Sequence, residues 1–275
     1  MRLVPEESEE FAAAKNSPRG ERASATEVGE LESPSLFADV GHGPAAFELK
    51  FLLEEDRARG VEEIVRRSLA LDHHADPTRG NSYPTTSLYT DTPGFDVYCR
   101  RPAAGGCKYR VRRYGGDGPI FVEQKIKSGD RVRKRRAPVQ EPELAAVGRG
   151  EPHPDWPGIW FHNGITEQQL RPVCRIAYDR VAYLGVAEGH TVRVTFDRHV
   201  RGETTTDWEV KTVGETPVLL AGLVICEFKF RLSMPAIFKE IVEEYGLTPC
   251  SVSKYRRFMH SRLETNGQVE GPGDA

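Results

Sequence analysis

The sequence predicts an α+β fold, in which a closed, mostly antiparallel, eight-stranded β tunnel carries flanking helices. Two observations predict it. About eight segments alternate apolar and polar residues, with short turns and a few helical segments between them. In addition, the polar faces of several strands are rich in ionised groups, and Glu-x-Lys recurs at 48–50, 123–125 and 227–229. Residues two apart on a strand share a face, so a sheet curled with these faces inward would enclose a charged lumen.

The residue pattern in the first third of the domain predicts a strand, a helix and a second strand. Apolar Phe and Leu alternate with Glu and Lys over 47–53, which is typical of a strand. Apolar residues then recur at helical spacing along one side of 54–70, and this predicts a helix. A second strand is predicted over 83–90, because it alternates and ends at the turn sequence Asp91-Thr92-Pro93-Gly94.

The centre of the chain is predicted to be a meander. Strands are expected at 108–114, 120–127 and 131–139, because Gly/Asp-rich segments between them are hairpin signals. A short helix is expected over 140–147. The stretch 148–162 is rich in Pro, Trp and Gly and is expected to be a loop.

The remaining third predicts more strands and then two helices. Alternating or apolar segments predict strands at 173–183, 191–197, 206–213 and 218–232. Helices are expected at 235–245 and 252–262, and Pro235 suits the first turn of the former.

Charge divides the chain into three parts. Residues 1–43 carry nine acidic against four basic residues and lack apolar periodicity, which predicts a disordered acidic leader. Residues 44–262 are expected to form the tunnel domain, and 263–275 a flexible tail. Although the net charge is only −3, residues 100–136 carry thirteen Lys/Arg against three acidic residues. Such a basic block raises the local concentration of anions and implies an acidic ligand.

Composition also excludes several classes of protein. No apolar run is long enough for a membrane span. The five scattered cysteines predict reduced thiols in a cytoplasmic protein rather than disulfides or zinc ligands. Few aromatic residues flank the basic ones, so no nucleic-acid partner is expected; protein partners are not indicated. No P-loop motif occurs.

The pair His73-His74 follows the first predicted helix. It is assigned only an interaction with the dipole of that helix.

The cationic faces are the candidate phosphate site. Buried cations are costly without counter-charges, and a triphosphate or polyphosphate supplies them, with two oxygens available to each guanidinium. The residues that these faces nominate are Arg110, Arg112, Lys125, Lys134, Arg136, Arg180 and Arg193.

The carboxylates on the same faces have two interpretations. Glu227 and Glu48 offer the hard oxygen ligands that a divalent cation bridging phosphates requires. Alternatively, each Glu pairs with the Lys of its own strand and only orients it. Glu227 is favoured as a metal ligand because it follows an apolar run that should be buried.

Nine segments, in order, resemble the VTC domain, the polyphosphate polymerase module of the vacuolar transporter chaperone family within the triphosphate tunnel, or CYTH-like, superfamily. They run from Phe47-Glu48-Leu49-Lys50-Phe51, through Tyr109-Arg110-Val111-Arg112 and Ile225-Cys226-Glu227-Phe228-Lys229, to Ser253-Lys254-Tyr255. The chain is similar to a stand-alone soluble form of that domain. The inositol-phosphate sensing domain and transmembrane helices of fungal members are not found in it.

The resemblance implies a tunnel that binds ATP and a growing polyphosphate chain with Mn²⁺ or Mg²⁺. The family's principal basic positions match Lys50, Arg110, Arg112, Lys125, Arg180 and Arg193, which are the predicted catalytic residues. Further phosphate binding is assigned to Lys134, Arg136, Lys229 and Lys254. The family's metal-binding glutamate matches Glu227, with Glu48 as the second predicted ligand.

Three functions remain open from the sequence. The first is an ATP-dependent polyphosphate polymerase that transfers the γ-phosphate of ATP to the chain end. The second is a tunnel triphosphatase acting on inorganic triphosphate or nucleoside triphosphates, and the third is a non-catalytic polyphosphate-binding module. Hydrolytic relatives typically carry E-x-E-x-K on the first strand, whereas Ala46 stands at the first glutamate position here, which favours the polymerase.

Overall fold

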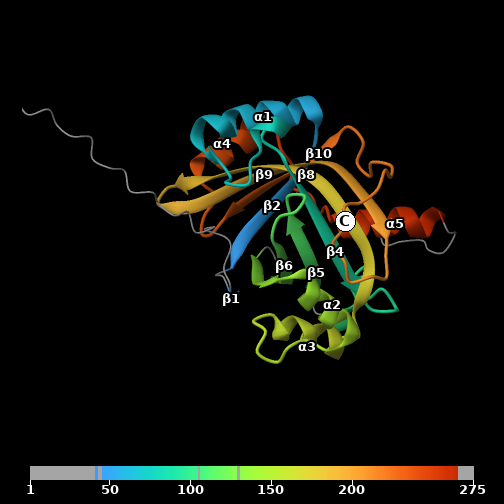
Figure 1. Ribbon diagram of the computed structural model, residues 1–275. Helices are drawn as coiled ribbons and strands as arrows, with labels where there is room; N and C mark the ends of the chain where they lie inside the picture. Colours follow the sequence, from blue (N-terminus) through green and yellow to red (C-terminus); the bar gives the residue numbers. More distant parts are fainter. Residues whose placement is uncertain (1–40, 43–44, 105, 129–130, 266–275) are drawn as a thin grey trace, which may run out of the picture. The chain divides into compact units, whose positions relative to one another are not determined.

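The tunnel is a closed barrel of eight antiparallel strands, which confirms the predicted fold class (Figure 1). The structure is a computed structural model, and it describes residues 41–42, 45–104, 106–128 and 131–265. Around the barrel the strands follow the order β2 (Ala46–Glu54), β10 (Leu223–Phe230), β9 (His190–Thr204), β8 (Arg171–Ala187), β4 (Tyr83–Asp91), β5 (Cys107–Tyr114), β6 (Ile120–Ser128) and β7 (Arg131–Val139). The barrel closes where β7 pairs with β6 on one side and with β2 on the other.

Two-residue strands extend the sheet beyond the barrel. β1 (Gly41–His42) pairs with β7, although it falls within the segment expected to be disordered. β3 (Ala70–Leu71) pairs with β8. The rest of the predicted acidic leader lies outside the described residues, as does the predicted tail from residue 266 onward.

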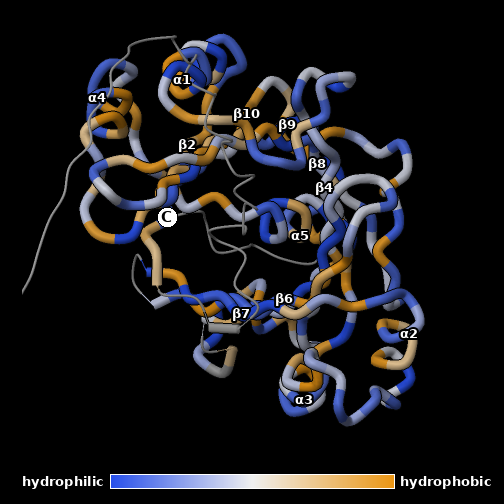
Figure 2. The backbone as a smooth tube through the Cα atoms, turned by 60° about the vertical axis from the view of Figure 1, so that its left-hand side comes forward, coloured by the Kyte–Doolittle hydropathy of each residue, from blue (hydrophilic) through white to orange (hydrophobic). Residues whose placement is uncertain are grey.

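Helices cover the outside of the barrel and make its apolar cores. α1 (Glu55–Ser68) and α4 (Ala236–Glu244) lie over β2, β9 and β10, and this core includes the fully buried Phe51 and Phe228 (Figures 1 and 2). α2 (Glu141–Arg149) and α3 (Ile159–Glu167) pack on the opposite side. Side chains point alternately to the two faces of each strand. Because the helices cover the apolar faces from outside, the charged faces line the lumen.

The last helix, α5 (Lys254–Thr265), packs across one end of the barrel. Tyr255 is buried, stacks on Tyr89 at 5.4 Å between ring centroids, and donates a hydrogen bond of 2.5 Å to Asp91. In Figure 2, α5 lies between the β2–β10 side and the β6–β7 side of the barrel. Short 3₁₀ turns at Pro77–Arg79 and Pro102–Ala104 complete the elements. No helix in the part of the chain described here is both long and apolar enough to span a bilayer.

Five predicted elements differ from the structure, two in kind and three in length. Residues 206–213 form no strand; Trp208 and Val210, which alternate with polar residues, pack on the core without ladder pairing. The expected loop 148–162 contains the start of α3, whose Phe161 is fully buried. β8 and β9 are longer than predicted and form one hairpin, whereas β10 is shorter than the predicted 218–232.

Candidate phosphate-binding tunnel

A cavity of about 510 Å³ lies inside the barrel, and all eight strands line it. Fourteen of its lining residues are Lys or Arg, and two are Glu. The structure brings together all twelve residues nominated from the sequence: Glu48, Lys50, Arg110, Arg112, Lys125, Lys134, Arg136, Arg180, Arg193, Glu227, Lys229 and Lys254. Their chemical roles remain predictions.

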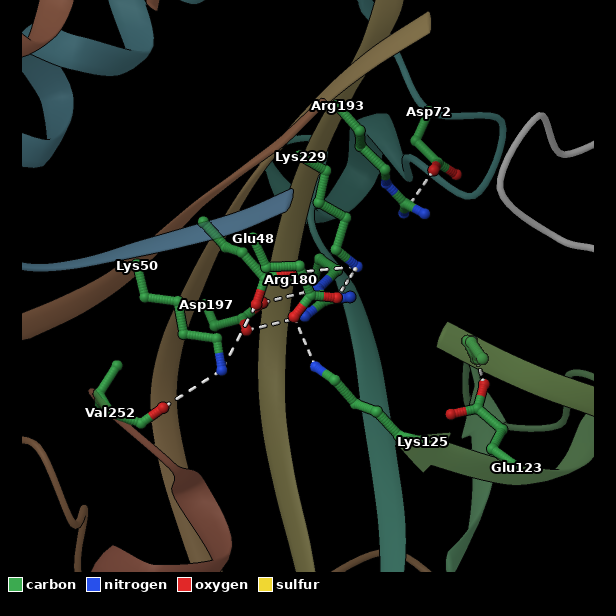
Figure 3. A network of polar contacts seen from close by, with 12 residues as sticks. Glu48, Lys50, Asp72, Glu123, Lys125, Arg180, Arg193, Asp197, Lys229 and Val252 are labelled. Atoms are coloured by element: carbon green, nitrogen blue, oxygen red, sulfur yellow. Dashed lines mark hydrogen bonds and ion pairs between the residues drawn. The ribbon is translucent and has the colours of Figure 1, made fainter. Parts of the chain in front are cut away.

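One group of charges joins β2, β6 and β10 (Figure 3). Lys229 Nζ lies 3.0 Å from Glu227 Oε1 and 3.4 Å from Glu48 Oε1. Glu48 also pairs with Lys125 at 2.5 Å, and Glu227 with Lys50 at 3.6 Å. Two of the three Glu-x-Lys pairs therefore bind across strands, and only Glu227 and Lys229 pair within one strand. The interpretation in which each Glu merely orients its own Lys holds for that strand alone.

A second group is centred on Asp197, which is 2% exposed. Arg180 donates two hydrogen bonds to it, at 2.6 and 2.8 Å, and Lys254 donates a third at 2.5 Å. Burial opposes ionisation of Asp197, but the two cations hold its pKa well below the usual range. Asp197 therefore stays ionised and fixes two predicted phosphate ligands.

A third group is centred on Glu123, which is fully buried. Arg110 and Lys134 contact its carboxylate at 2.7 and 2.5 Å. Burial opposes ionisation here too, and the neighbouring cations lower the pKa of Glu123 well below its usual value. The guanidinium of Arg110 is thus held in place, and its remaining N–H groups can donate hydrogen bonds to a ligand.

Arg112 and Arg136 line the lumen without a carboxylate partner among the described residues. Arg112 is 5% exposed; it donates to Ser87 Oγ at 2.9 Å and lies near the rings of Tyr114 and Tyr178. Arg136 is partly exposed and lies over the Phe121 ring. A buried guanidinium without an anion is costly. These two residues make the lumen a site that an anionic ligand would stabilise.

Tyr178 lines the cavity beside two of its cations. Its hydroxyl is buried without a hydrogen-bond partner among the described residues, and its ring lies 4.3 Å from Lys254 Nζ and 5.2 Å from the Arg180 guanidinium. A buried hydroxyl normally has a partner. A phosphate oxygen in the cavity would accept its hydrogen bond.

The carboxylates of the first group fit a hard divalent ion. Burial and the Glu227 carboxylate raise the pKa of Glu48, yet the neighbouring lysines outweigh both and lower it to about 2. Burial also opposes ionisation of Glu227, but nearby cations hold its pKa well below the usual range. Both carboxylates are therefore ionised, and both reach the single ammonium of Lys229. Such a pair, completed by phosphate oxygens and water, is the donor set that Mg²⁺ and Mn²⁺ prefer.

The lowered pKa values of two lumen lysines predict that polyphosphate binding and the stability of the ligand-free protein change in opposite directions with pH. Burial and neighbouring cations lower the pKa of Lys108 to about 7; burial likewise lowers that of Lys125 to about 8, although Glu48 opposes the shift. Polyphosphate binding should weaken from pH 7 to 8.5 as these ammonium groups lose their protons. In the same window the unfolded chain binds more protons than the folded one, so the free energy of unfolding of the ligand-free protein should rise.

Titration calorimetry with tripolyphosphate and urea unfolding across this pH range would check both signs. Lys125→Met should flatten the two slopes, and the exposed Lys239→Met should leave them unchanged. Stability that falls over the window in the ligand-free protein would contradict the assignment.

The sequence placed Glu123 on a charged face through the Glu-x-Lys repeat but gave it no binding role, and it nominated neither Asp197 nor Asp72. Asp197 lies on a lumen-facing position of β9, within a segment that the sequence did single out, so period-two alternation could have found it. Asp72 could not be found this way. It lies in a loop, and its contact with Arg193, 2.7 Å from Nη2 to Oδ2, joins residues 121 positions apart.

The chain resembles one protein family and several solved structures. The model of the VTC domain family matches residues 45–262. Among solved structures, the chain is similar to HpAC1 from Hippeastrum, described with a dominant triphosphatase activity, at 12% identity and a TM-score of 0.47, covering 84% of this chain and 100% of that one. It is also similar to the adenylate cyclase candidate bh2851 from Bacillus halodurans, at 10% identity and 0.46, covering 78% and 95%. PH1819 from Pyrococcus horikoshii follows at 16% identity and 0.43, covering 79% and 99%. No curated protein matches the chain.

Proposed function

The chain belongs to the VTC domain family, and from that premise we propose that it is an ATP-dependent polyphosphate polymerase. The observation that carries the proposal is the lumen itself: fourteen Lys/Arg against two Glu on the lining of a cavity reached by all eight strands. That surplus of cations matches a ligand whose charge is repeated along its length. ATP and polyphosphate are its proposed substrates.

The proposed reaction is transfer of the γ-phosphoryl group of ATP to the end of a chain. A terminal phosphate oxygen of the polyphosphate forms a bond to the γ-phosphorus, and the bond from that phosphorus to the β,γ-bridging oxygen breaks. ADP leaves, and the chain is one phosphate longer. Because the attacking atom is a phosphate oxygen, the protein needs no nucleophile of its own.

The protein contributes positioning and charge neutralisation, which dominate catalysis of phosphoryl transfer. Arg112, which has no carboxylate partner in the described part of the chain, is proposed to bind the transferring phosphoryl group, and Arg110 to bind beside it while Glu123 holds its guanidinium. Arg180 and Lys254, fixed by Asp197, would bind neighbouring phosphates. Each cation is oriented before substrate arrives, so little reorganisation is needed at the moment of transfer.

Glu48 and Glu227 are proposed to hold Mn²⁺ or Mg²⁺. Both carboxylates are ionised and converge on Lys229, which would move aside or share the site. The bound ion would neutralise phosphate charge. Lys50 and Lys125, which contact the same carboxylates, would then be released toward the phosphates.

The same lumen is also compatible with a second candidate, a tunnel triphosphatase, because a metal ion held by the two converging carboxylates could serve hydrolysis equally well. Ala46 lines the cavity at the position where hydrolytic relatives are expected to carry another glutamate. This favours the polymerase. A polyphosphate-binding module without catalysis is the third possibility.

One assay separates the three functions. Purified protein is incubated with ATP and Mn²⁺, and ADP, free phosphate and long-chain polyphosphate are followed together. ADP with a polyphosphate ladder and little free phosphate is the expected result. Free phosphate that matches nucleotide loss, without a ladder, would make the protein a triphosphatase. Polyphosphate binding without any turnover would make the protein a non-catalytic polyphosphate-binding module.

A cytoplasmic location is part of the proposal. All five cysteines are free thiols, and three of them are buried. Reduced thiols are typical of a reducing compartment.

A further inference from the structure

The loop that follows β3 carries three metal-ligating side chains that the proposed function does not use. The ligand atoms of Asp72, His73 and His74 all lie within 4.8 Å of one another. We propose that this loop binds one divalent transition-metal ion of the Zn²⁺ class. The site would be separate from the Glu48–Glu227 pair and would border the tunnel, because Asp72 contacts Arg193 and His74 contacts Tyr114, which both line the cavity.

The carboxylate of Asp72 is held as a metal-ligating carboxylate usually is. It is 5% exposed, and Oδ2 accepts a hydrogen bond from Arg193 Nη2 at 2.7 Å. Oδ1 accepts the backbone N–H of His74 at 3.0 Å and lies 3.4 Å from His73 Nδ1. A carboxylate oxygen has two lone pairs, so Oδ1 can accept that N–H and still coordinate a cation. Arg193 then acts as the outer partner that fixes the ligand's orientation.

Stacking holds the second ligand. The His74 ring lies parallel to the Tyr114 ring, with 4° between the planes and 5.4 Å between centroids, and it also contacts Tyr83 at 5.3 Å. No hydrogen bond to a ring nitrogen of His74 occurs in the described part of the chain. His73 is half exposed, with its ring centroid 3.9 Å from that of His74, so a small rotation of its side chain can close the site.

The donor set selects the class of ion. Two imidazoles and one carboxylate suit Zn²⁺, Co²⁺ and similar borderline ions, whereas Mg²⁺ prefers oxygen ligands alone. Three protein ligands leave a fourth position for water or for an oxygen of a ligand in the tunnel. That a phosphate oxygen takes this position rests on the proposed function; metal binding by the loop does not.

The test uses the full-length, tag-free chain, stripped of metal and without nucleotide. Co²⁺ is titrated while visible absorption is recorded, and Zn²⁺ is then added in competition. The wild type is expected to bind one Co²⁺ at this site with a tetrahedral spectrum that Zn²⁺ abolishes. His73→Ala and His74→Ala should each weaken binding about ten-fold or more, since loss of even an outer partner costs that much.

Two controls make the result specific. The exposed His190→Ala should bind Co²⁺ as the wild type does. The double variant Glu48→Gln/Glu227→Gln should keep the same spectrum. Wild-type spectra in both His73→Ala and His74→Ala, loss of the spectrum only in the glutamate variant, or no Co²⁺ binding by the wild type would each overturn the proposal. Because no substrate is present, failure of the polymerase assay would leave this result unaffected.

Discussion

Replacing Glu227 with glutamine is expected to lower metal-dependent turnover by about 10²–10³-fold while polyphosphate binding changes by less than about three-fold. Glutamine keeps the shape of the side chain but loses the negative charge that a divalent ion requires. Removing that charge leaves Lys50 and Lys229 less neutralised, so the lumen becomes more cationic. Binding of the polyanion should therefore persist when turnover is lost.

Arg112→Ala is the matched comparison, and it should lose both turnover and binding. Arg112 has no carboxylate partner in the described residues, so its charge is available entirely to the ligand. Glu240→Gln, on the exposed side of α4, should change neither quantity. Turnover measured with ATP and Mn²⁺, alongside calorimetry with polyphosphate, would give the two values. Equal loss of binding in the Glu227 and Arg112 variants would be incompatible with the metal role of Glu227.

The second large effect concerns stability. Asp197→Asn is expected to lower the free energy of unfolding by about 3–5 kcal/mol, because it leaves the buried Arg180 and the partly buried Lys254 without their counter-charge. Arg180 and Lys254 both donate to this carboxylate, and Arg180 is only 7% exposed. Tripolyphosphate should stabilise the variant more than the wild type, because it supplies the missing negative charge.

A neighbouring residue provides the control. Asp179 precedes Arg180 in the sequence but faces outward, where it pairs with Arg79 and His199. Asp179→Asn should cost less than about 1 kcal/mol, because such exposed pairs contribute little. Urea unfolding with and without tripolyphosphate would measure all of these values. If Asp197→Asn unfolds like Asp179→Asn, the lumen does not depend on the Asp197 carboxylate.

Much of the barrel was predictable because the alternation of apolar and polar residues within a strand can be recognised from that segment alone. Glu48 and Lys50 share one face of β2, while Phe51 faces α1, and this alternation is visible without any partner strand. The same reasoning failed at 206–213. There, Trp208 and Val210 alternate with polar residues but pack on the core, and alternation alone does not distinguish such packing from pairing in a sheet.

The partners of the lumen cations were less predictable. Glu48 was expected to lie near Lys50, yet it pairs with Lys125, 77 residues away. Which lysine meets which carboxylate depends on the register between β2, β10 and β9 and on closure of the barrel through β7. A shift by one residue in any of these strands would turn the charged face outward.

The sequence by itself determined which residues face the lumen, because side-chain direction on a strand is a local property with a period of two. It thereby placed eleven of the twelve nominated side chains on charged strand faces, whereas Lys254, on α5, was assigned from the family resemblance. Only the tertiary structure decided how those charges are neutralised. Asp197 and Glu123 fix Arg180, Lys254, Arg110 and Lys134, while Arg112 and Arg136 are left without an acidic partner in the described residues. Ion pairing depends on distances of a few ångströms between strands that are far apart in the chain, and those distances exist only once the barrel has closed.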